Sequence, residues 1–439
     1  MLKKIKEIIW LDNPIRLFYH KIRAIIANVR YGFPHKNMII IWITGTNWKT
    51  TTCNIVARWL QEAWKKVFMF STVNIIVDDE EHVNNTKMTS PDVFDLQEWL
   101  SYAKMKWCEI AIIETASHWI KMNRIWWINY DIVALTNITQ DHLDLHRTMK
   151  DYVNTKLEIF KNLMYYTRKP WVKKVAVINI DSKYAETFMA ETYDTLFTYG
   201  KGHKANLKPA YIETSIEGTT FSLKIPWDDI KIKTSLIWEF NVYNIMCAVW
   251  IFSSLGFSRE TIKKAVLKVK WVPWRMDSIS SKDGFKVYID YAHTEDALEN
   301  VLETLRNLDW VKRIITVFWA TWDRDKTKRP IMGQVVNNYS DVIILTEDDN
   351  YSEDVHEIIK DILPWIERKQ GEDFWIIPER KEAIRTALIS AREGDIVLLA
   401  GKWDEHKIMR NHWIDEWHDK TVAQKILDEI EENKLVVKK

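Results

Sequence analysis

Glycine is scarce in this chain, which has only 11 glycines in 439 residues. Average usage of about 7% would give roughly 31. Tryptophan is in excess instead, with 24 residues. The 11 glycines and 24 tryptophans together make 35, which is close to the expected number of glycines. We therefore test, motif by motif, the hypothesis that many tryptophans stand where the fold needs glycine.

Cysteine, net charge and long apolar runs are also low or absent. The three cysteines have no CxxC spacing, which excludes a zinc ribbon and indicates a reducing compartment. A net charge of +1 gives no basic field, so no nucleic-acid partner is expected. No apolar run is long enough for a transmembrane segment, and no secretory signal is visible. We expect a cytoplasmic protein.

The chain is long enough for two or three domains. Residues 1–37 are basic and partly amphipathic. They predict a helix packed on the body of the protein, with a helix lying on a membrane surface as the alternative. From Met38 onward, short β-rich runs alternate with helical stretches, a pattern typical of an α/β fold with a parallel sheet covered on both faces. We place a boundary near residue 272, which gives domains at 38–271 and 272–439.

The stretch IWITGTNWKTTT at residues 41–52 is typical of a phosphate-binding loop between a strand and a helix. Backbone N–H groups at a helix N-terminus and the helix dipole bind phosphate. Lys49 is predicted to meet the terminal phosphates of a nucleotide, and the Thr50 hydroxyl to bind Mg²⁺. Trp48, just before the lysine, stands where such loops need glycine.

Acidic and imidazole side chains follow two further apolar runs. Glu114 ends CEIAIIET, and TNITQDHLDLH at 136–146 follows YDIVAL. The carboxyl ends of parallel strands are where ligands bind in such sheets. The cluster is therefore predicted to hold a metal ion that bridges ATP phosphates. Lys156, taken alone, would be interpreted as a surface lysine.

In the second domain, three polar segments each follow an apolar strand: DYAHTEDALENVL, TWDRDKTKRP and LLAGKWDEH. Any one of them is plausible as a solvated turn, but all three together indicate a site. Its candidate residues are Asp290, His293, Asp323, Arg324, Asp325 and Lys402.

Taken together, these segments resemble those of a known protein family. Nine segments are similar, in their order along the chain, to motifs of the Mur ligases: TGTNWKTTT, MTSPD, ETASHWIKMNRIWWINYD, TNITQDHLDLHRTMKDYVNTKLEIF, IWEFNVYN, VPWRMD, DYAHTEDALENVL, WDRDKTKRPIMG and AGKWDE. These are ATP-dependent amide ligases of peptidoglycan precursor synthesis. The MurE branch, which adds the third residue of the stem peptide, is the most similar. The resemblance implies a central P-loop-type ATPase domain with a mostly parallel sheet and a C-terminal Rossmann-like α/β domain.

The resemblance also implies a mechanism and a set of residues. ATP converts a substrate carboxylate to an acyl phosphate, and an incoming amine displaces phosphate to form an amide. The implied catalytic residues are Lys49, Glu114, His142 and Lys156. Metal ligands are Thr50, Glu114, His142 and a carbamylated Lys156, which would bind a second Mg²⁺. ATP contacts are Gly45, Thr46, Asn47, Lys49, Thr50, Thr51, Asn137, Asp141, Asn241, Arg275, Asp290, Tyr291 and His293. The residues implied to contact the peptidoglycan precursor and the free amino acid are Thr89, Ser90, Ser117, Arg124, Lys402 and Glu405.

The family patterns also bear on the missing glycines. They read TGTNGKT, SHGL, GxFNVYN, VPGR, GDRD and AGKG, and each of these glycines is a tryptophan here: Trp48, Trp119, Trp238, Trp274, Trp322 and Trp403. Trp42 and Trp127 are assigned to the same set. An indole at position 48 is expected to fill the phosphate position. The hypothesis is that the natural gene uses UGA for glycine, and UGG codons at Trp48, Trp274 and Trp322 would refute it.

Two departures from the family pattern affect the substrates. Only 37 residues precede the loop strand, so the N-terminal uridine-binding domain of MurE enzymes is expected to be missing. The UDP end is then held differently, or the acceptor is another muropeptide. The DNPR motif of diaminopimelate enzymes reads DDNY at 348–351, so a bidentate arginine contact is lost. We predict a diamino acid as substrate, and lysine or another amino acid is as plausible as diaminopimelate.

Two alternatives stay open. One is a ligase similar to folylpolyglutamate synthase. The other is a non-catalytic nucleotide-binding scaffold in which the tryptophans are genuine. The joint presence of Lys49, Glu114, His142 and Lys156 argues against the scaffold. A monomer is expected.

Overall fold

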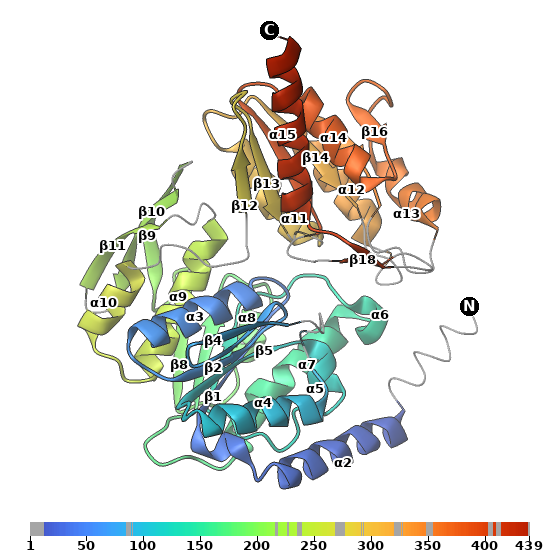
Figure 1. The fold of residues 1–439 in the computed structure, drawn as a ribbon. Coiled ribbons are helices and arrows are strands. Elements are labelled where there is room, and N and C mark those ends of the chain that lie inside the picture. The colour runs from blue at the N-terminus through green and yellow to red at the C-terminus, as the bar shows by residue number, and fades with distance from the viewer. Residues whose placement is uncertain are drawn as a thin grey trace. The chain divides into compact units, whose positions relative to one another are not determined.

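The computed structural model describes residues 13–84, 89, 91–215, 218–225, 228–234, 239–267, 277–290, 292, 294–319, 326, 328–347, 354–402, 407–409 and 414–437. The chain divides into two compact units, Met1–Val272 and Pro273–Lys439 (Figure 1). Each unit has its own sheet. Of the described helices, none has an apolar stretch long enough to span a bilayer.

An eight-stranded sheet forms the centre of the first unit, in the order β4-β3-β2-β5-β1-β6-β7-β8. Strands β2, β5, β1, β6, β7 and β8 run parallel, and β3 and β4 add an antiparallel edge. Runs of Ile and Val make these strands because β-branched side chains fit a buried pleated surface. The bounds are β1 Ile39–Thr44, β2 Val67–Phe70, β3 Asn74–Val77, β4 Glu80–Val83, β5 Ile110–Thr115, β6 Ile132–Leu135, β7 Val175–Asn179 and β8 Thr195–Tyr199.

Helices cover both faces of this sheet. Alternate residues of β1 point to opposite faces: Ile41 and Ile43 belong to one hydrophobic core with α3 and α9, and Ile40 and Trp42 to another with α4 and α7. The described helices are α2 Pro14–Arg30, η1 Pro34–Asn37, α3 Lys49–Glu62, α4 Val93–Met105, α5 Ser117–Lys121, α6 Leu143–His146, α7 Met149–Lys161, η2 Asn162–Tyr165, α8 Ala185–Met189, α9 Glu239–Ser254 and α10 Arg259–Leu267.

The helix arrangement creates a topological switch point between β1 and β6. Strands β1 and β6 are neighbours, yet α3 follows β1 on one face and α7 follows β6 on the other. Such a switch opens a crevice outside the carboxyl ends of the two strands. An antiparallel sheet of β9 Lys208–Ser215, β10 Gly218–Ile225 and β11 Asp228–Thr234 adds Phe221 and Ile232 to the core on the α3 side.

The second unit has a six-stranded sheet in the order β12-β13-β17-β14-β15-β16, parallel except for the β12–β13 pair. Its elements are β12 Asp277–Ser280, β13 Lys286–Asp290, α11 Glu295–Arg306, β14 Arg313–Phe318, α12 Lys328–Tyr339, β15 Val342–Leu345, α13 Val355–Ile362, η3 Leu363–Trp365, β16 Phe374–Ile376, α14 Arg380–Ser390, β17 Asp395–Ala400, β18 Lys407–Met409, β19 Ile414–Glu416 and α15 Asp419–Val437. The α/β class with a mostly parallel sheet in each unit is confirmed.

Several tryptophans have a backbone conformation that favours glycine. Ten described non-glycine residues have positive φ, and five of them are tryptophans: Trp48 (φ 68°), Trp64 (59°), Trp107 (62°), Trp127 (70°) and Trp171 (66°). This region costs a residue with a side chain about 1–2 kcal/mol. Three of the five (Trp64, Trp107 and Trp171) are at least 80% exposed, so packing does not offset that cost. They extend the glycine hypothesis to positions that the family motifs had not identified.

Trp64 and Trp107 show why a glycine belongs there. Each follows the last turn of a helix, and the next residue's N–H bonds a carbonyl five positions back: Lys65 N to Leu60 O and Cys108 N to Ala103 O. This is the Schellman motif, whose left-handed residue is usually glycine.

Trp42 and Trp119 behave differently from the positive-φ group. Both are fully buried, and their rings lie 6.1 Å apart. The Trp119 indole donates to Pro91 O at 2.7 Å, whereas the Trp42 indole N–H has no hydrogen-bond partner among the described residues. A buried unpaired donor is unfavourable. Trp238, Trp274, Trp322 and Trp403 lie outside the described residues.

Candidate functional site

The loop after β1 packs closely against the residues that follow β6. Gly45 has φ 152°, and a Cβ there would lie 1.9 Å from Thr136 Oγ1 and 3.0 Å from Asn137 N. Only glycine allows this approach. The loop therefore leads into the N-terminus of α3 directly beside the carboxyl end of β6.

Asn137 fixes the loop from the β6 side. Thr46 N donates to Asn137 O at 2.9 Å, and Asn47 N donates to Asn137 Oδ1 at 2.8 Å. The Thr46 hydroxyl lies 3.0 Å from the Tyr152 hydroxyl on α7. The Asn137 side-chain N–H₂ is buried and has no partner among the described residues, so it has donors left for a ligand. Tyr152 was not predicted from the sequence.

Thr50 and Glu114 are brought together at the ends of β1 and β5. The Thr50 hydroxyl donates to Glu114 Oε2 at 2.9 Å, and both residues are buried. Lys49, one residue earlier, donates from Nζ to Thr46 O at 2.6 Å. A hydroxyl and a carboxylate at a helix N-terminus are oxygen ligands of the kind that Mg²⁺ takes together with phosphate.

Thr72 belongs to this cluster, although it was not predicted as a site residue. Its N–H and hydroxyl donate to Glu114 at 2.9 and 3.0 Å, and its hydroxyl lies 2.8 Å from that of Thr89. Thr72 comes two residues after the end of β2. The rule that ligand-binding residues follow parallel strands would have identified it.

Trp48 occupies a different space from the one expected. Its ring stacks on Phe240 of α9, with centroids 5.6 Å apart and planes at 9°, and lies 6.3 Å from the Tyr243 ring. The expectation that the indole fills the phosphate position is not what the structure shows. Its backbone is left-handed, as a glycine's would be.

Lys156 is buried, not a surface lysine. Its Nζ donates to Gly45 O at 2.7 Å, with Thr44 Oγ1 at 3.4 Å and the Tyr152 ring centroid at 4.7 Å. Burial lowers the pKa of Lys156 well below its ordinary value, and nearby Lys49 adds to this effect. A neutral amine held against the phosphate-binding loop is the chemical form that reacts with CO₂.

His142 lies at the start of α6, close to a second imidazole. Its Nε2 is 3.2 Å from Asp141 Oδ2, and its ring centroid is 4.7 Å from that of His118. His146, in the same segment, is fully buried and lies 2.9 Å from the Ser117 hydroxyl. The structure therefore directs His146 and the predicted substrate residue Ser117 toward each other.

His146 is expected to make stability depend on pH. Burial, reinforced by Lys121, lowers the pKa of His146 to about 3. Between about pH 6.5 and 3 the unfolded chain binds a proton that the folded chain does not, so stability falls as the pH drops through this window. We expect His146→Gln to reduce that slope, by up to about 1.4 kcal/mol per pH unit, in urea unfolding at pH 7.5, 6 and 5.

The exposed His203 provides the matched control, and His203→Gln should leave the slope unchanged. His35 will keep part of the slope in both variants, because burial also lowers its pKa to about 3. Equal pH dependence in the His146 variant and the parent would contradict the prediction.

The remaining predicted site residues lie on several different elements, and some are outside the described residues. Arg124 Nε is buried and has no hydrogen-bond partner among the described residues, which suits an anionic group. Asn241, on α9, accepts from Asn244 at 3.1 Å. Thr51 is buried in the first turn of α3. Ser90, Arg275, Tyr291, His293, Asp323, Arg324, Asp325, Glu405 and residues 348–351 lie outside the described residues.

In the second unit, Asp290 and Lys402 lie near the ends of neighbouring strands. Asp290 pairs in register with Ala400, two residues before Lys402. Both side chains are buried. The Asp290 carboxylate accepts from Ala292 N at 2.8 Å, which fixes the turn after β13.

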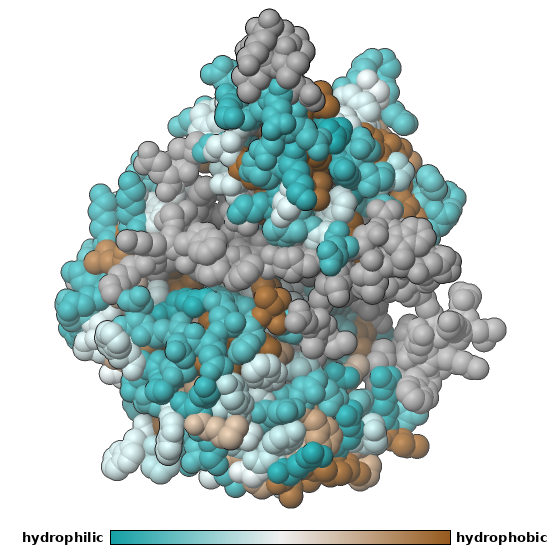
Figure 2. Space-filling model, in the orientation of Figure 1, coloured by the Kyte–Doolittle hydropathy of each residue, from teal (hydrophilic) through white to brown (hydrophobic). Residues whose placement is uncertain are grey.

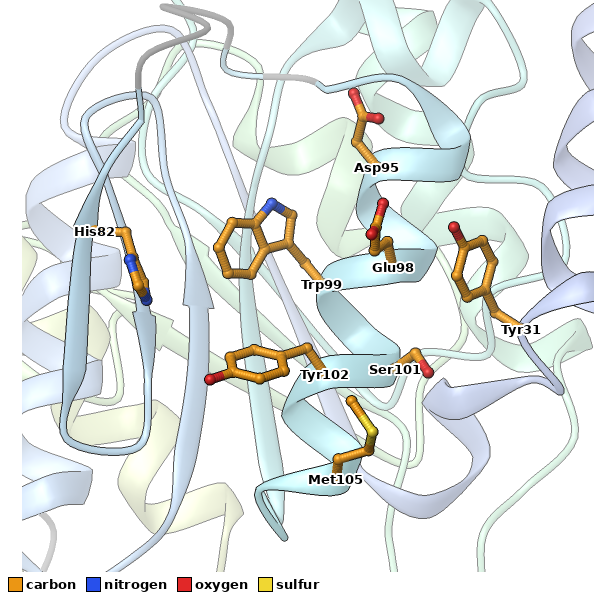
Figure 3. A pocket seen from close by; sticks show the side chains of 8 residues that line it. All are labelled: Tyr31, His82, Asp95, Glu98, Trp99, Ser101, Tyr102 and Met105. Carbon is orange, nitrogen blue, oxygen red and sulfur yellow. The ribbon is translucent and has the colours of Figure 1, made fainter.

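The first unit also has a hollow of about 690 Å³ beside α4. Figure 3 shows Trp99 and Tyr102 pointing from α4 toward His82 on the β3–β4 hairpin, with Asp95 and Glu98 nearby. The residues described as lining it include none of those predicted for the site. The polar groups after β1, β5 and β6 are therefore the stronger candidate.

The set of metal ligands within the described residues is small. They contain no group of three or more His, Cys, Asp or Glu arranged to hold a metal ion. The fit to Mg²⁺ therefore depends on the Thr50 hydroxyl and the Glu114 carboxylate, with further oxygens from phosphate.

The arrangement is that of a nucleotide-dependent α/β enzyme, and comparison with known proteins gives the family. Residues 43–252 match the Mur ligase middle domain, and residues 274–403 match the Mur ligase glutamate ligase domain. The chain belongs to the Mur ligase family, and it is an ATP-dependent carbon–nitrogen ligase that works with Mg²⁺.

Individual proteins agree with this assignment. The chain is 36% identical over 424 residues to UDP-N-acetylmuramoyl-L-alanyl-D-glutamate–2,6-diaminopimelate ligase of Geobacillus kaustophilus, covering 95% of this chain and 85% of that protein. A solved structure with the same name is 28% identical, with a TM-score of 0.63 over 94% of this chain and 83% of the other. Folylpolyglutamate synthase of Mycobacterium tuberculosis, at 16% identity, a TM-score of 0.70 and coverage of 87% and 91%, shares the fold.

Proposed function

We propose that this ligase joins a diamino acid to the terminal carboxylate of a UDP-MurNAc-dipeptide-like precursor. The name of the Geobacillus relative supports this acceptor and amino-acid class. The main observation in support is a cluster at the ends of β1 and β5. In it the Thr50 hydroxyl contacts Glu114, and the buried Lys156 contacts the loop that follows β1. Such a cluster could hold the Mg²⁺ that would neutralise charge on the transferring phosphate.

The loop residues hold the nucleotide in this proposal. Lys49 and the α3 N-terminus neutralise phosphate charge, while Gly45, Thr46, Asn47, Thr50 and Thr51 shape the cradle. Thr50, Glu114, His142 and a carbamylated Lys156 would hold Mg²⁺. When bound, Mg²⁺ offsets the negative charge that repels the attacking carboxylate. Asn137 and Asp141 border the site. The Asn137 side-chain N–H₂, which has no hydrogen-bond partner in the part of the chain that the structure describes, supports this assignment.

The remaining assignments follow the family pattern. Asn241, Arg275, Asp290, Tyr291 and His293 contact ATP. Thr89, Ser90, Ser117 and Arg124 contact the precursor. An anionic partner for Arg124 is supported by its buried Nε, which lacks a hydrogen-bond partner among the residues that the structure describes. Lys402 and Glu405 hold the incoming amino acid. We further propose domains at 38–271 and 272–439, a monomer, and a cytoplasmic location, where ATP and a UDP-linked precursor are both at hand.

A ligation assay tests the proposal. A variant with glycine at Trp42, Trp48, Trp119, Trp127, Trp238, Trp274, Trp322 and Trp403 (the restored protein) is given ATP, UDP-MurNAc-dipeptide and either diaminopimelate or lysine. We expect phosphate release only with both substrates, and a tripeptide product by mass spectrometry. Glu114→Gln should abolish turnover, whereas Glu109→Gln, at an exposed carboxylate beside the same strand, should not. Turnover with a folate and glutamate instead would overturn the proposal.

A further inference from the structure

The outer face of α2 exposes a continuous row of large apolar side chains. The row consists of Ile15 (78% exposed), Phe18 (63%), Tyr19 (56%), Ile22 (38%), Ile26 (51%) and Val29 (59%). Spacings of three and four residues put them on one side of the helix. Figure 2 shows brown surface at the lower edge of the first unit, where Figure 1 places α2. We call these six residues the apolar stripe.

The opposite face of α2 fixes the helix on the body of the first unit. Ala24 and Ala27 are buried in a small core with Val93 of α4. Arg23 forms an ion pair with Asp92 at 2.9 Å, and Asn28 donates to Trp126 O at 3.3 Å. The helix is held by this face, so the apolar stripe points away from the unit.

Cationic residues border the apolar stripe. Helix α2 carries Arg16, Lys21, Arg23 and Arg30 and has no Asp or Glu. At about 100° per residue, Arg16 and Arg30 lie along one border of the stripe, on the same side as the Arg23 that pairs with Asp92. Lys21 lies along the other border, with its Nζ 3.6 Å from the centroid of the Trp126 ring. An apolar face with cationic borders is the composition of a helix that lies in a membrane interface.

We propose that α2 docks this ligase on the surface of an anionic lipid bilayer. The apolar stripe enters the boundary between headgroups and acyl chains, and Arg16 and Arg30 at its border meet the headgroups. Charge decides between this occupant and a second copy of the chain. Two copies packed stripe to stripe would bring their cationic borders together, which is unfavourable.

Vesicle co-sedimentation of the full chain tests this proposal. We expect binding to vesicles of phosphatidylglycerol and phosphatidylcholine, and far less to phosphatidylcholine alone. The combined Ile15→Gln, Phe18→Gln and Ile22→Gln substitutions should lower partitioning at least about tenfold. A matched triple, Leu267→Gln, Ile331→Gln and Ile389→Gln, also removes exposed apolar side chains and should leave it unchanged.

The charge contribution is measured separately. Combined Arg16→Gln and Arg30→Gln should lower binding to the anionic vesicles roughly twentyfold and leave binding to neutral vesicles unaltered. Circular dichroism and the melting temperature establish that each variant folds. Failure of the parent chain to bind anionic vesicles would overturn the proposal. So would a dimer, detected by light scattering, that the triple variant in α2 dissociates.

Discussion

Glycine at position 48 is expected to raise kcat/KM for ATP at least about a hundredfold. The comparison is made between the restored protein and the same protein with Trp48 kept. Trp48 is the residue before Lys49, and its φ of 68° is left-handed. Its indole ties the loop to α9 by stacking on Phe240. Glycine removes both the backbone strain and this contact, so that the loop can adjust to phosphate.

Trp64 provides the matched control, because it stands at the other end of α3 with φ 59° and is 94% exposed. Trp64→Gly should raise stability by about 1 kcal/mol, measured by urea unfolding, and leave ATP turnover unchanged. Equal turnover with tryptophan or glycine at position 48 would count against the glycine hypothesis and favour the scaffold alternative.

The centre of the first sheet could be predicted from the sequence because β1, β5, β6 and β7 are buried apolar runs with a polar residue at or just after the carboxyl end. Glu114 and Asn137 illustrate this, since parallel strands bring their ends to one edge. Contacts between particular side chains could not be predicted from this pattern. Thr72, which follows β2, could have been identified as a candidate by the same rule, but its contact with Glu114 also requires that β2 pairs with β5, and a sequence does not state which strands are neighbours.

Packing and backbone angles explain the other differences between the predictions and the structure. Lys156 has the sequence context of a surface helix, yet α7 directs it under the phosphate-binding loop. The direction of the Trp48 ring depended on Phe240, nearly two hundred residues away in sequence. The glycine deficit was visible from composition, but the left-handed positions Trp64, Trp107 and Trp171 needed backbone angles.

Lys156→Ala is expected to lower kcat of the restored protein roughly a thousandfold, because the carbamate that would hold Mg²⁺ at the transferring phosphate is lost. A lysine with the usual pKa near 10.4 is about four parts in ten thousand neutral at pH 7. Burial and Lys49 lower the pKa of Lys156, so its neutral amine is far more abundant and can form a carbamate. Lowering the pH protonates the amine and should reduce the carbamate signal seen by NMR with ¹³C-bicarbonate.

Lys161, on the same helix with its side chain half exposed, is the control, and Lys161→Ala should retain both activity and the carbamate signal. Removal of CO₂ from the buffer should lower turnover of the parent, and added bicarbonate should restore it, with no such response in Lys156→Ala. If Lys156→Ala stays active, or if the parent shows no carbamate signal, the assigned role is wrong. Since Lys156 Nζ already donates to Gly45 O, loss of the loop's position must be separated from loss of the carbamate. Lys156→Arg keeps a cationic donor at the loop but forms no carbamate, so it should be as inactive as the alanine variant if the carbamate is what matters.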